Sequence, residues 1–300
     1  MTCDVCGQPA RDEELIQIND RWICASCKPL FLQQLTEGTL PPPAFPLPDE
    51  FDERILDYFV LVKLSARLVW RDWAPILGLS LLAAVPVNLF LLAIGVFEGE
   101  SPISVAQQYW ATGLLEVLIA VVASLGIAKV VSERMEGRQI GFGGGLEHAL
   151  RRWLPGIGTG LLGNLIAGFL LLLLIVPGLI WLGYYSFTSP IVSLRGCAGS
   201  TALDYSKALV RGRWWAVVGR IFVLGAIVFV IMVPIQVAVA LAPPWPSLSF
   251  AAAVLGDLCY IPATVGTTVL FLNLDAMQRR SPDRTRIPDI PALRPSISTW

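Results

Sequence analysis

The chain has 300 residues, of which 55% are hydrophobic and 15% are charged, and its formal net charge is −1. Soluble domains carry about 25% charged residues, so a chain this apolar needs lipid to cover its surface. The near-zero net charge argues against nucleic acid as a partner. A single histidine excludes chemistry that needs a pair of imidazoles.

A small zinc ribbon with a β-hairpin is predicted for residues 1–35. Two C-x-x-C pairs lie on either side of two short β-type runs, which flank the turn signal Asn19-Asp20. A hairpin would return the second pair to the first, so that four thiolates hold one structural Zn²⁺ tetrahedrally. The predicted metal ligands are Cys3, Cys6, Cys24 and Cys27. The alternatives are two disulfides, which need an oxidising compartment, and a redox-active C-x-x-C, which usually occurs once.

A Pro-rich linker is predicted for residues 36–50, extended and semi-rigid at about 3 Å per residue. It would tether the ribbon to an all-α membrane domain over residues 51–280. Residues 281–300 are expected to form a disordered cytosolic tail.

Six transmembrane helices are predicted within residues 51–280. Five apolar blocks follow the linker, and one span needs about 20 residues. The third block, residues 156–194, is too long for one helix and contains Pro177-Gly178, a turn signal that divides it. The predicted spans are residues 76–97, 109–131, 156–176, 179–194, 214–241 and 248–274.

The connecting segments alternate between basic segments and segments without Lys or Arg. The basic segments are residues 54–71, 129–152, 195–213 and 279–294. The segments without Lys or Arg are residues 98–108, 177–178 and 243–247. Because Lys and Arg favour the cytosolic side, both termini are expected in the cytosol, and the membrane is expected to be the bacterial cytoplasmic (inner) membrane. The cysteines of a cytosolic ribbon would remain reduced thiols, which favours zinc binding over disulfide formation.

Three of the spans begin with the same pattern, W-x-[P/A]-x-[L/I/V]-G, at Trp73, Trp153 and Trp214. Each follows a stripe of apolar residues at helical spacing, typical of an amphipathic helix in the cytosolic interface. The stripes contain Ile55, Phe59, Val62, Ala66 and Val69, then Phe142, Leu146 and Ala149, then Ala202, Tyr205 and Leu209. Three units, each an interfacial helix plus a helical hairpin, would form a pseudo-threefold repeat. The alternative is that there is no repeat, and that the shared pattern only reflects the preference of Trp and Arg for membrane interfaces.

Two local predictions concern the starts of these interfacial helices. The glycine run at residues 141–145 is expected to be a flexible lead into the second helix, because it lacks the G-K-[S/T] ending of a phosphate-binding loop. Thr201 and Asp204 are expected to cap the third helix.

Four polar residues fall at membrane depth and form a candidate intramembrane site. They are Asp257, Glu116, Asn88 and Asn164. Charged groups in a bilayer are costly and often functional, so the cluster could bind a proton, an ion or a lipid headgroup. The alternative is a carboxyl group that hydrogen-bonds neighbouring helices and stabilises them by about 1 kcal/mol. No catalytic or cofactor-binding residues are predicted.

The central third of the chain resembles the membrane domain attached to some bacterial glycerophosphoryl diester phosphodiesterases and its stand-alone six-span relatives. The matching residues are Ile175, Val176, Pro177, Gly178, Leu179, Pro190, Ala202, Leu203, Ser206, Leu209, Gly212, Trp214 and Trp215. The resemblance extends over residues 54–280 and implies a six-span domain. In the fused enzymes a separate soluble barrel performs catalysis with two histidines and a metal. This chain has one histidine and no room for a barrel, so the activity does not carry over.

The expected function is therefore that of a non-enzymatic inner-membrane protein in contact with the lipid bilayer. Its ribbon is a candidate docking or assembly module for a cytosolic protein partner. The alternative is a transporter or lipid-handling protein that uses the four intramembrane polar residues. A membrane enzyme acting on lipid headgroups is a third hypothesis, for which the sequence contains no motif.

Overall fold

The computed structural model describes residues 15–18, 21–29, 32–33, 47–48, 51–96, 104–241 and 245–280. The chain divides into two units, Met1–Ala44 and Phe45–Trp300. The predicted tail, residues 281–300, and all of the predicted linker except residues 47–48 lie outside the described residues.

The N-terminal unit contains a two-stranded antiparallel hairpin. Strand β1 (Leu15–Ile18) pairs with β2 (Arg21–Cys24), with Leu15 opposite Cys24 and Ile18 opposite Arg21. Branched apolar residues in both strands favour this extended pairing. The hairpin predicted around Asn19-Asp20 is therefore confirmed.

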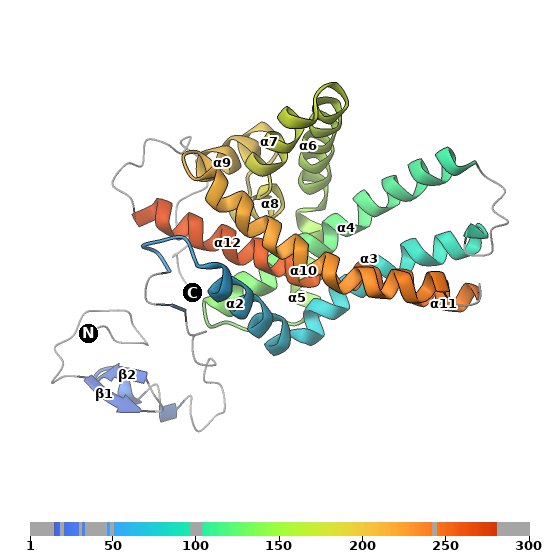
Figure 1. Ribbon diagram of the computed structural model, residues 1–300. Coiled ribbons are helices and arrows are strands. Elements are labelled where there is room, and N and C mark those ends of the chain that lie inside the picture. The colour runs from blue at the N-terminus through green and yellow to red at the C-terminus, as the bar shows by residue number, and fades with distance from the viewer. Residues whose placement is uncertain are drawn as a thin grey trace. The chain divides into compact units, whose positions relative to one another are not determined.

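The second unit is helical in all of its described regular elements. They are α2 (Tyr58–Arg71), α3 (Trp73–Ala93), α4 (Val105–Met135), α5 (Phe142–Arg151), α6 (Trp153–Leu173), α7 (Ile175–Tyr184), α8 (Thr188–Arg195), α9 (Ser200–Val210), α10 (Trp214–Leu241), α11 (Pro246–Leu258) and α12 (Ile261–Arg280). The long helix α4 is central, because it packs against α3, α5, α6, α8 and α12 (Figure 1). The predicted all-α class holds for this unit.

Buried apolar side chains form one cluster, to which most of the helices contribute. Its fully buried members include Leu68 of α2, Leu125 of α4, Ile191 of α8, Tyr205 of α9 and Phe271 of α12. Away from this cluster, α6 and α7 diverge from α3, α4 and α11 (Figure 1). The helices are thus well packed at one end and separated at the other.

The separated ends expose large apolar side chains. Leu172, near the end of α6, is 88% exposed, and Leu241, the last residue of α10, is 83% exposed. Soluble monomers rarely expose contiguous apolar surfaces of this kind, which mark contact with a membrane or a partner. Among the described residues, four helical stretches are long and apolar enough to cross a bilayer: Trp73–Ala93, Trp153–Leu170, Trp214–Val239 and Pro246–Arg279. The chain is therefore a helical membrane protein.

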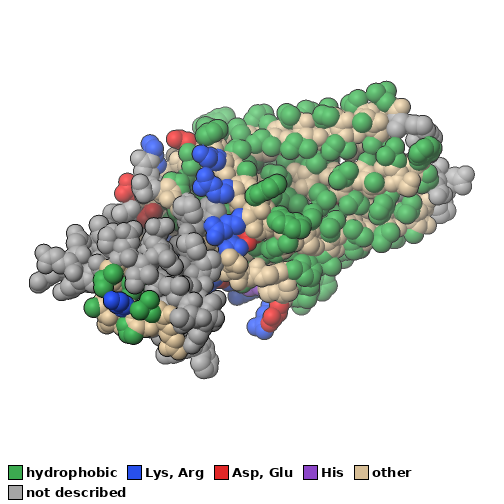
Figure 2. Space-filling model, turned by 90° about the horizontal axis from the view of Figure 1, so that it is seen from below, with side chains coloured by type: hydrophobic (Ala, Val, Ile, Leu, Met, Phe, Trp, Pro, Cys, Tyr) green, Lys and Arg blue, Asp and Glu red, His purple; other side chains and the backbone are tan. Residues whose placement is uncertain are grey.

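Charged side chains gather at one end of the helical unit. Figure 2 shows Lys and Arg in a band, with a hydrophobic surface extending away from it on the visible face. The band follows from the sequence, since the described segments 74–96, 153–184 and 221–241 contain no charged residue. One end of the helical unit is thus suited to water and lipid headgroups, and the rest is suited to hydrocarbon.

Three helices begin with a proline in their first turn, after a break inside a predicted apolar block. Helix α6 ends at Leu173 and Leu174 is extended, so the break comes three residues before the predicted turn at Pro177-Gly178. Residues 185–187 separate α7 from α8, which contains Pro190, so residues 179–194 are not one continuous helix. Cys259 and Tyr260 likewise interrupt residues 248–274, before Pro262 of α12.

Proline itself explains where these breaks fall. It has no N–H to give to the carbonyl four residues earlier, and its ring crowds that carbonyl, but it is accepted in the first turn of a new helix. The predicted turn at Pro177-Gly178 is wrong by three residues because the proline begins the next helix and does not form the turn. Pro86 and Pro234 remain inside α3 and α10, as membrane helices allow.

The three predicted interfacial segments are the helices α2, α5 and α9. The glycine run is not a flexible lead, because α5 already begins at Phe142. Gly199, with φ of 62°, is the N-cap of α9 and no side chain caps this helix, so the predicted cap by Thr201 and Asp204 is wrong. The predicted stripe of α9 is buried, with Ala202 and Tyr205 at most 1% exposed.

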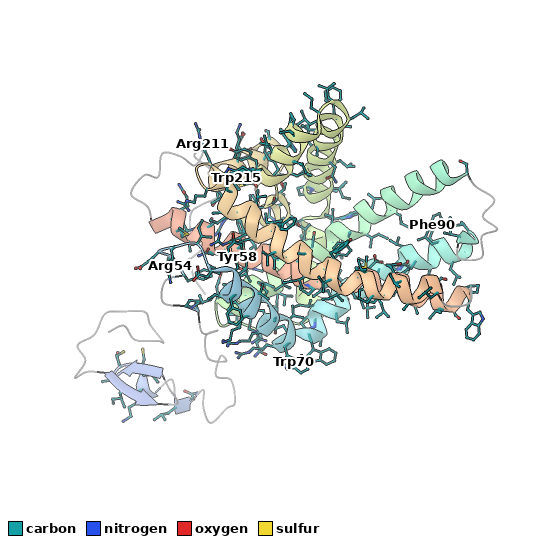
Figure 3. All side chains as sticks on the ribbon, in the orientation of Figure 1. Arg54, Tyr58, Trp70, Phe90, Arg211 and Trp215 are labelled. Atoms are coloured by element: carbon teal, nitrogen blue, oxygen red, sulfur yellow. The ribbon has the colours of Figure 1, made fainter. Side chains whose placement is uncertain are left out.

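Helix α2 has two apolar faces. Leu61, Leu64 and Leu68 are buried against the core, whereas Phe59 of the predicted stripe is 77% exposed. Trp70 is 86% exposed and points away from the helices (Figure 3). A helix that packs through one face and presents aromatic residues on another is suited to lie at the headgroup level.

Candidate functional site

The second C-x-x-C pair sits at the end of the hairpin. Cys24 is the last residue of β2, and a tight turn brings the N–H of Cys27 to 3.0 Å from the carbonyl oxygen of Cys24. Cys24 Sγ lies 3.1 Å from Ser26 Oγ. This turn places two thiol-bearing residues on one short loop, as a tetrahedral thiolate site requires.

The other two predicted metal ligands, Cys3 and Cys6, lie outside the described residues. Among the residues that the structure describes, no group of three or more metal-binding side chains comes together. That result is expected for a four-cysteine site of which only Cys24 and Cys27 are described, so the zinc site stays a prediction.

The structure brings together two of the four predicted intramembrane residues. Asn88 of α3 donates a hydrogen bond from Nδ2 to Asp257 Oδ2 of α11, over 2.7 Å. Asn88 is 3% exposed and also donates to the carbonyl oxygen of Ala84 over 2.9 Å. Both hydrogens of the Asn88 amide are therefore used, and one of them holds the carboxyl group of Asp257.

Asp257 lines a cavity of about 490 Å³ between α3, α4, α11 and α12. Small side chains of α3 and α4 form much of the wall, among them Ala83, Ala84, Ala120 and Ala123. The polar residues that line it are Asp257, Ser80, Ser124, Tyr260 and Thr264. A cavity with apolar walls and a few convergent polar groups has the character of a ligand site.

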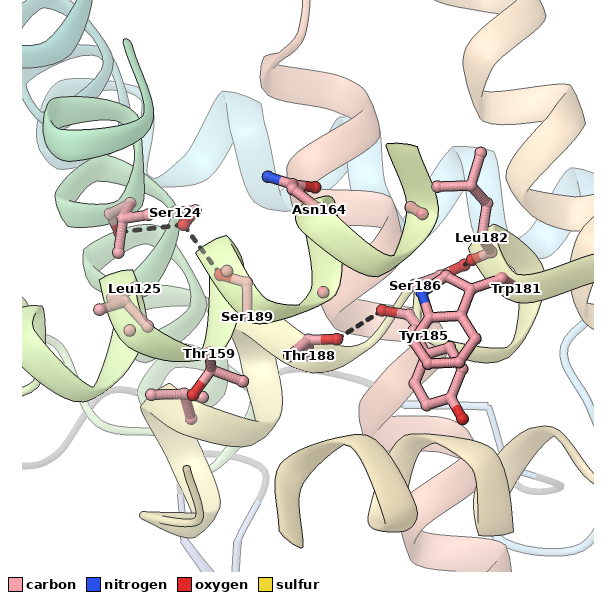
Figure 4. A pocket seen from close by; sticks show the side chains of 16 residues that line it. Ser124, Leu125, Thr159, Asn164, Trp181, Leu182, Tyr185, Ser186, Thr188 and Ser189 are labelled. Carbon is pink, nitrogen blue, oxygen red and sulfur yellow. Dashed lines mark hydrogen bonds between the residues drawn. The ribbon is translucent and has the colours of Figure 1, made fainter. Parts of the chain in front are cut away.

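Of the other two predicted residues, Asn164 does not join this pair. Asn164 lies on α6 and lines a second cavity, of about 400 Å³, together with Thr159, Trp181, Tyr185 and Ser189 (Figure 4). Glu116 belongs to α4, but its side chain lies outside what the structure describes. The three predicted residues whose side chains the structure describes thus lie at two separate cavities, Asn88 and Asp257 at one and Asn164 at the other.

The second cavity differs chemically from the first because its described lining contains no charged residue. Its hydroxyl groups mostly bond to the protein itself: Thr188 Oγ1 donates to the Tyr185 carbonyl over 2.5 Å, and Ser189 donates to Ser124 Oγ over 2.8 Å (Figure 4). The second bond ties α8 to α4, and the first holds the turn between α7 and α8, so this lining is chiefly structural.

Sequence reasoning missed a set of buried charges at the basic end. Arg134 of α4 donates two hydrogen bonds to Asp72, the residue between α2 and α3, and both are 6% exposed. Asp275 of α12 accepts from Arg195 and from the hydroxyl of Tyr205. Burial and the adjacent Asp275 carboxylate raise the pKa of Tyr205 well above its ordinary value. These contacts join α4 to the start of α3, and α12 to α8 and α9.

Other polar groups in this band are held in a similar way. Burial alone would raise the pKa of Glu133, but hydrogen bonds from Arg138 and Lys129 lower it below its usual value. Arg220 of α10 donates to the carbonyl oxygens of Leu56 and Ala216, over 2.6 and 2.7 Å. No periodicity or motif marked the contacts of Asp72 with Arg134, Asp275 with Arg195 and Arg220 with Leu56, because these partners are 62, 80 and 164 residues apart.

No family model, curated protein or solved structure matches the chain. The interpretation of the site therefore depends on its own geometry.

Proposed function

We propose that the chain is a six-pass membrane protein with both termini on the cytosolic side. The observation that carries this proposal is the band of charged side chains at one end of exposed, apolar helices (Figure 2). Four passes correspond to the four long apolar stretches. Helix α4, with 31 residues, is about 46 Å long and provides a fifth pass. Helices α7 and α8 together provide the sixth.

The order of the helices supports the proposed threefold repeat. Each unit has a short helix (α2, α5 or α9) followed by a long helix that begins with Trp73, Trp153 or Trp214. A single residue with similar dihedral angles joins the first two pairs, Asp72 with φ −113° and Arg152 with φ −106°. The third junction is longer and contains Gly212, with φ of 82°. The first and second units thus resemble each other more closely than either resembles the third.

The N-terminal unit would be a structural zinc ribbon that docks a cytosolic protein. The hairpin and the Cys24–Cys27 turn support this proposal, because they place two of the four cysteines on one loop. The metal would be structural, since four thiolates around Zn²⁺ leave no open coordination position for catalysis. A ribbon this small would depend on the metal for folding.

Metal analysis of the purified chain in reducing buffer tests the ribbon. We expect about one Zn²⁺ per chain and loss of the metal in Cys24→Ser and Cys27→Ser. The matched controls are Cys197→Ser and Cys259→Ser, which should keep it. Zinc well below one per chain in the unaltered protein would defeat the assignment.

Deleting residues 1–50 should leave membrane insertion unchanged.

The six-pass body would organise helices and lipid without catalysis. A second function is favoured by one observation, the contact of Asn88 with Asp257 beside a cavity. A carboxyl group at membrane depth beside a cavity is typical of a transport or lipid-binding pathway.

Lipid transfer in vesicles separates the two functions. The full chain is reconstituted with a phospholipid carrying a fluorescent acyl chain, and the fraction accessible to an impermeant quencher is followed in time. A transporter of lipid should accelerate transfer between leaflets, and Asp257→Asn should abolish the acceleration. Transfer at the rate of protein-free vesicles would exclude this lipid-transfer function and leave the scaffold.

A further inference from the structure

We propose that the cavity around Asp257 binds a hydrophobic amine, with its ammonium group on the carboxylate and its chain against the alanine-lined wall. This inference rests on the second proposed function and names the class of its ligand. Three properties support it: the depth of Asp257 in the membrane, the hydrogen-bonding character of the cavity, and the size of the cavity.

Asp257 lies near the middle of the bilayer in the proposed topology. It is the twelfth residue of α11, which begins at Pro246, so it is about 17 Å from that end of the helix. The hydrocarbon core is about 30 Å thick. The helix ends one residue later, at Leu258, and α12 begins at Ile261. Interrupted helices at this depth are a recurring feature of binding sites in transporters.

The Asp257 side chain is exposed to the cavity, whereas its partner Asn88 is buried. Among the described residues, Asn88 is the one hydrogen-bond partner of this carboxyl group, and it contacts only Oδ2. Oδ1 has no hydrogen bond from any described residue, and Asp257 lines the cavity. Because an ionised carboxylate in hydrocarbon is costly, a cationic ligand that binds Oδ1 would be strongly stabilised there.

The hydroxyl groups of the cavity add acceptors and few donors. Ser80 Oγ donates its hydrogen to the Ile76 carbonyl over 2.9 Å, and Thr264 Oγ1 donates to the Tyr260 carbonyl over 3.1 Å. Their remaining lone pairs are acceptors. Of the lining hydroxyls, that of Tyr260 forms no hydrogen bond among the described residues and can donate or accept. A site built from acceptors selects a ligand that supplies donors, as an ammonium group does.

The size and walls of the cavity favour an organic cation over a bare metal ion. Ca²⁺ and Mg²⁺ require about six or more oxygen ligands, whereas much of this wall consists of Ala83, Ala84, Val87, Ala120 and Ala123. A volume of about 490 Å³ lies within the range of small-molecule sites, about 300–1,000 Å³. A single charged group with an aliphatic chain matches both the carboxylate and the apolar wall.

The test is equilibrium binding of radiolabelled decylamine to the full chain in lipid nanodiscs, with empty nanodiscs as the background. We expect saturable binding that Asp257→Asn weakens by at least about tenfold, because a charge-assisted hydrogen bond is lost. Asp204→Asn, which removes an exposed carboxyl group of α9 outside the cavity, should bind normally. Decanol, which has the same chain without the charge, should not compete.

A second variant keeps the test decisive if Asp257→Asn fails to fold. Ala120→Phe retains the carboxyl group and fills the cavity from α4, where Ala120 is exposed, so it should also lose binding. Decylamine binding in both variants with the affinity of the unaltered protein would overturn the proposal, and so would competition by decanol as strong as that by unlabelled decylamine. So would a dimer that forms through Asp257 and covers the cavity.

The outcomes of the lipid-transfer test and of the amine-binding test are independent of each other. Amine binding without lipid transfer would keep this inference and exclude the lipid-transfer function. Lipid transfer that depends on Asp257, without amine binding, would keep the function and reject the ligand class.

Discussion

At the scale of single residues, buried polar side chains connect parts of the chain that are far apart in sequence. Asn273 of α12 illustrates this, because it is fully buried and its amide donates to the carbonyl oxygens of Phe51 and Arg54 while its Oδ1 accepts from the N–H of Leu56. One side chain thereby hydrogen-bonds three backbone groups of the segment before α2. The segment has no regular structure of its own and depends on this contact.

The buried pair of Asp72 and Arg134 provides the first prediction. Asp72→Ala would leave the Arg134 guanidinium buried without its counter-ion, which typically costs about 3–5 kcal/mol. We expect a loss of that size in the free energy of unfolding, measured by denaturant titration in mixed micelles. The control is Glu147→Ala, which breaks the exposed pair with Arg151 and should cost at most about 0.5 kcal/mol. Equal effects of the two substitutions would contradict the structure.

His148 predicts how stability depends on pH. Burial lowers its pKa below the ordinary value of 6.5. Its Nε2 lies 2.9 Å from the Ser193 carbonyl oxygen, which can only accept, so this nitrogen carries a hydrogen. The unfolded chain therefore takes up a proton at higher pH than the folded chain does, and the stability contributed by neutral His148 is complete above 6.5 and lost as the pH falls below it.

The measurement is the free energy of unfolding at several pH values from 5 to 8, for the unaltered protein and for His148→Gln. Because the chain contains one histidine, the substitution should flatten the curve between pH 5 and 6.5. An unchanged slope in His148→Gln would assign the pH dependence to carboxyl groups instead.

At the scale of helices, two features decide where elements begin and how closely they approach. Prolines set the starts of α7, α8 and α12, as described above. Glycines set the approach of α5 to α4, since a Cβ added to Gly126 would lie 3.1 Å from the carbonyl oxygen of Gly145 and 3.0 Å from Leu79 Cδ1. The backbones of α4 and α5 therefore meet at this pair, as small residues permit in membrane proteins.

Gly126→Leu should consequently separate α4 from α5. Overpacking of this kind costs about 1–3 kcal/mol, which should appear as a lower midpoint of thermal unfolding. Gly113→Leu is the matched control on the same helix, because nothing lies within 4 Å of a Cβ built at Gly113. If both variants unfold at the same temperature, the two glycines have equivalent surroundings and the close approach is wrong.

At the scale of the whole molecule, the basic band and the exposed apolar ends predict the topology. Single cysteines introduced at Ser101 and Ser247 should react with a membrane-impermeant maleimide added from outside. A cysteine at Arg211, in the basic band, should react only after the membrane is permeabilised. Protection of exactly one of the two outer positions would require an odd number of passes between them and would exclude six.

Much of the helical unit could be predicted from the sequence, because its apolar runs are long and its basic residues alternate between loops. The positions of α2, α3, α6 and α10 follow from hydropathy and from the W-x-[P/A]-x-[L/I/V]-G pattern. The breaks at Leu174 and at Cys259–Tyr260 could not be placed in this way, since a proline in an apolar run is compatible both with a continuous kinked helix and with the start of a new one.

The candidate site was predictable in its members and not in its arrangement. Asp257 and Asn88 were recognisable because polar groups are rare at membrane depth. Their contact, and the separation of Asn164 from both, depend on which face of α3 meets α11 and where α6 diverges.

The sequence by itself determined that this chain is a membrane protein and which of its segments are apolar enough to cross the bilayer. It also determined that a hairpin connects the two C-x-x-C pairs. These properties depend on solvent transfer and on local turn chemistry, which neighbouring residues decide. Only the tertiary structure decided which polar groups meet, namely Asn88 with Asp257, Asp72 with Arg134, and Asn273 with the segment before α2. The partners are separated by 169, 62 and more than 200 residues, and pairing at that range is set by how whole helices pack.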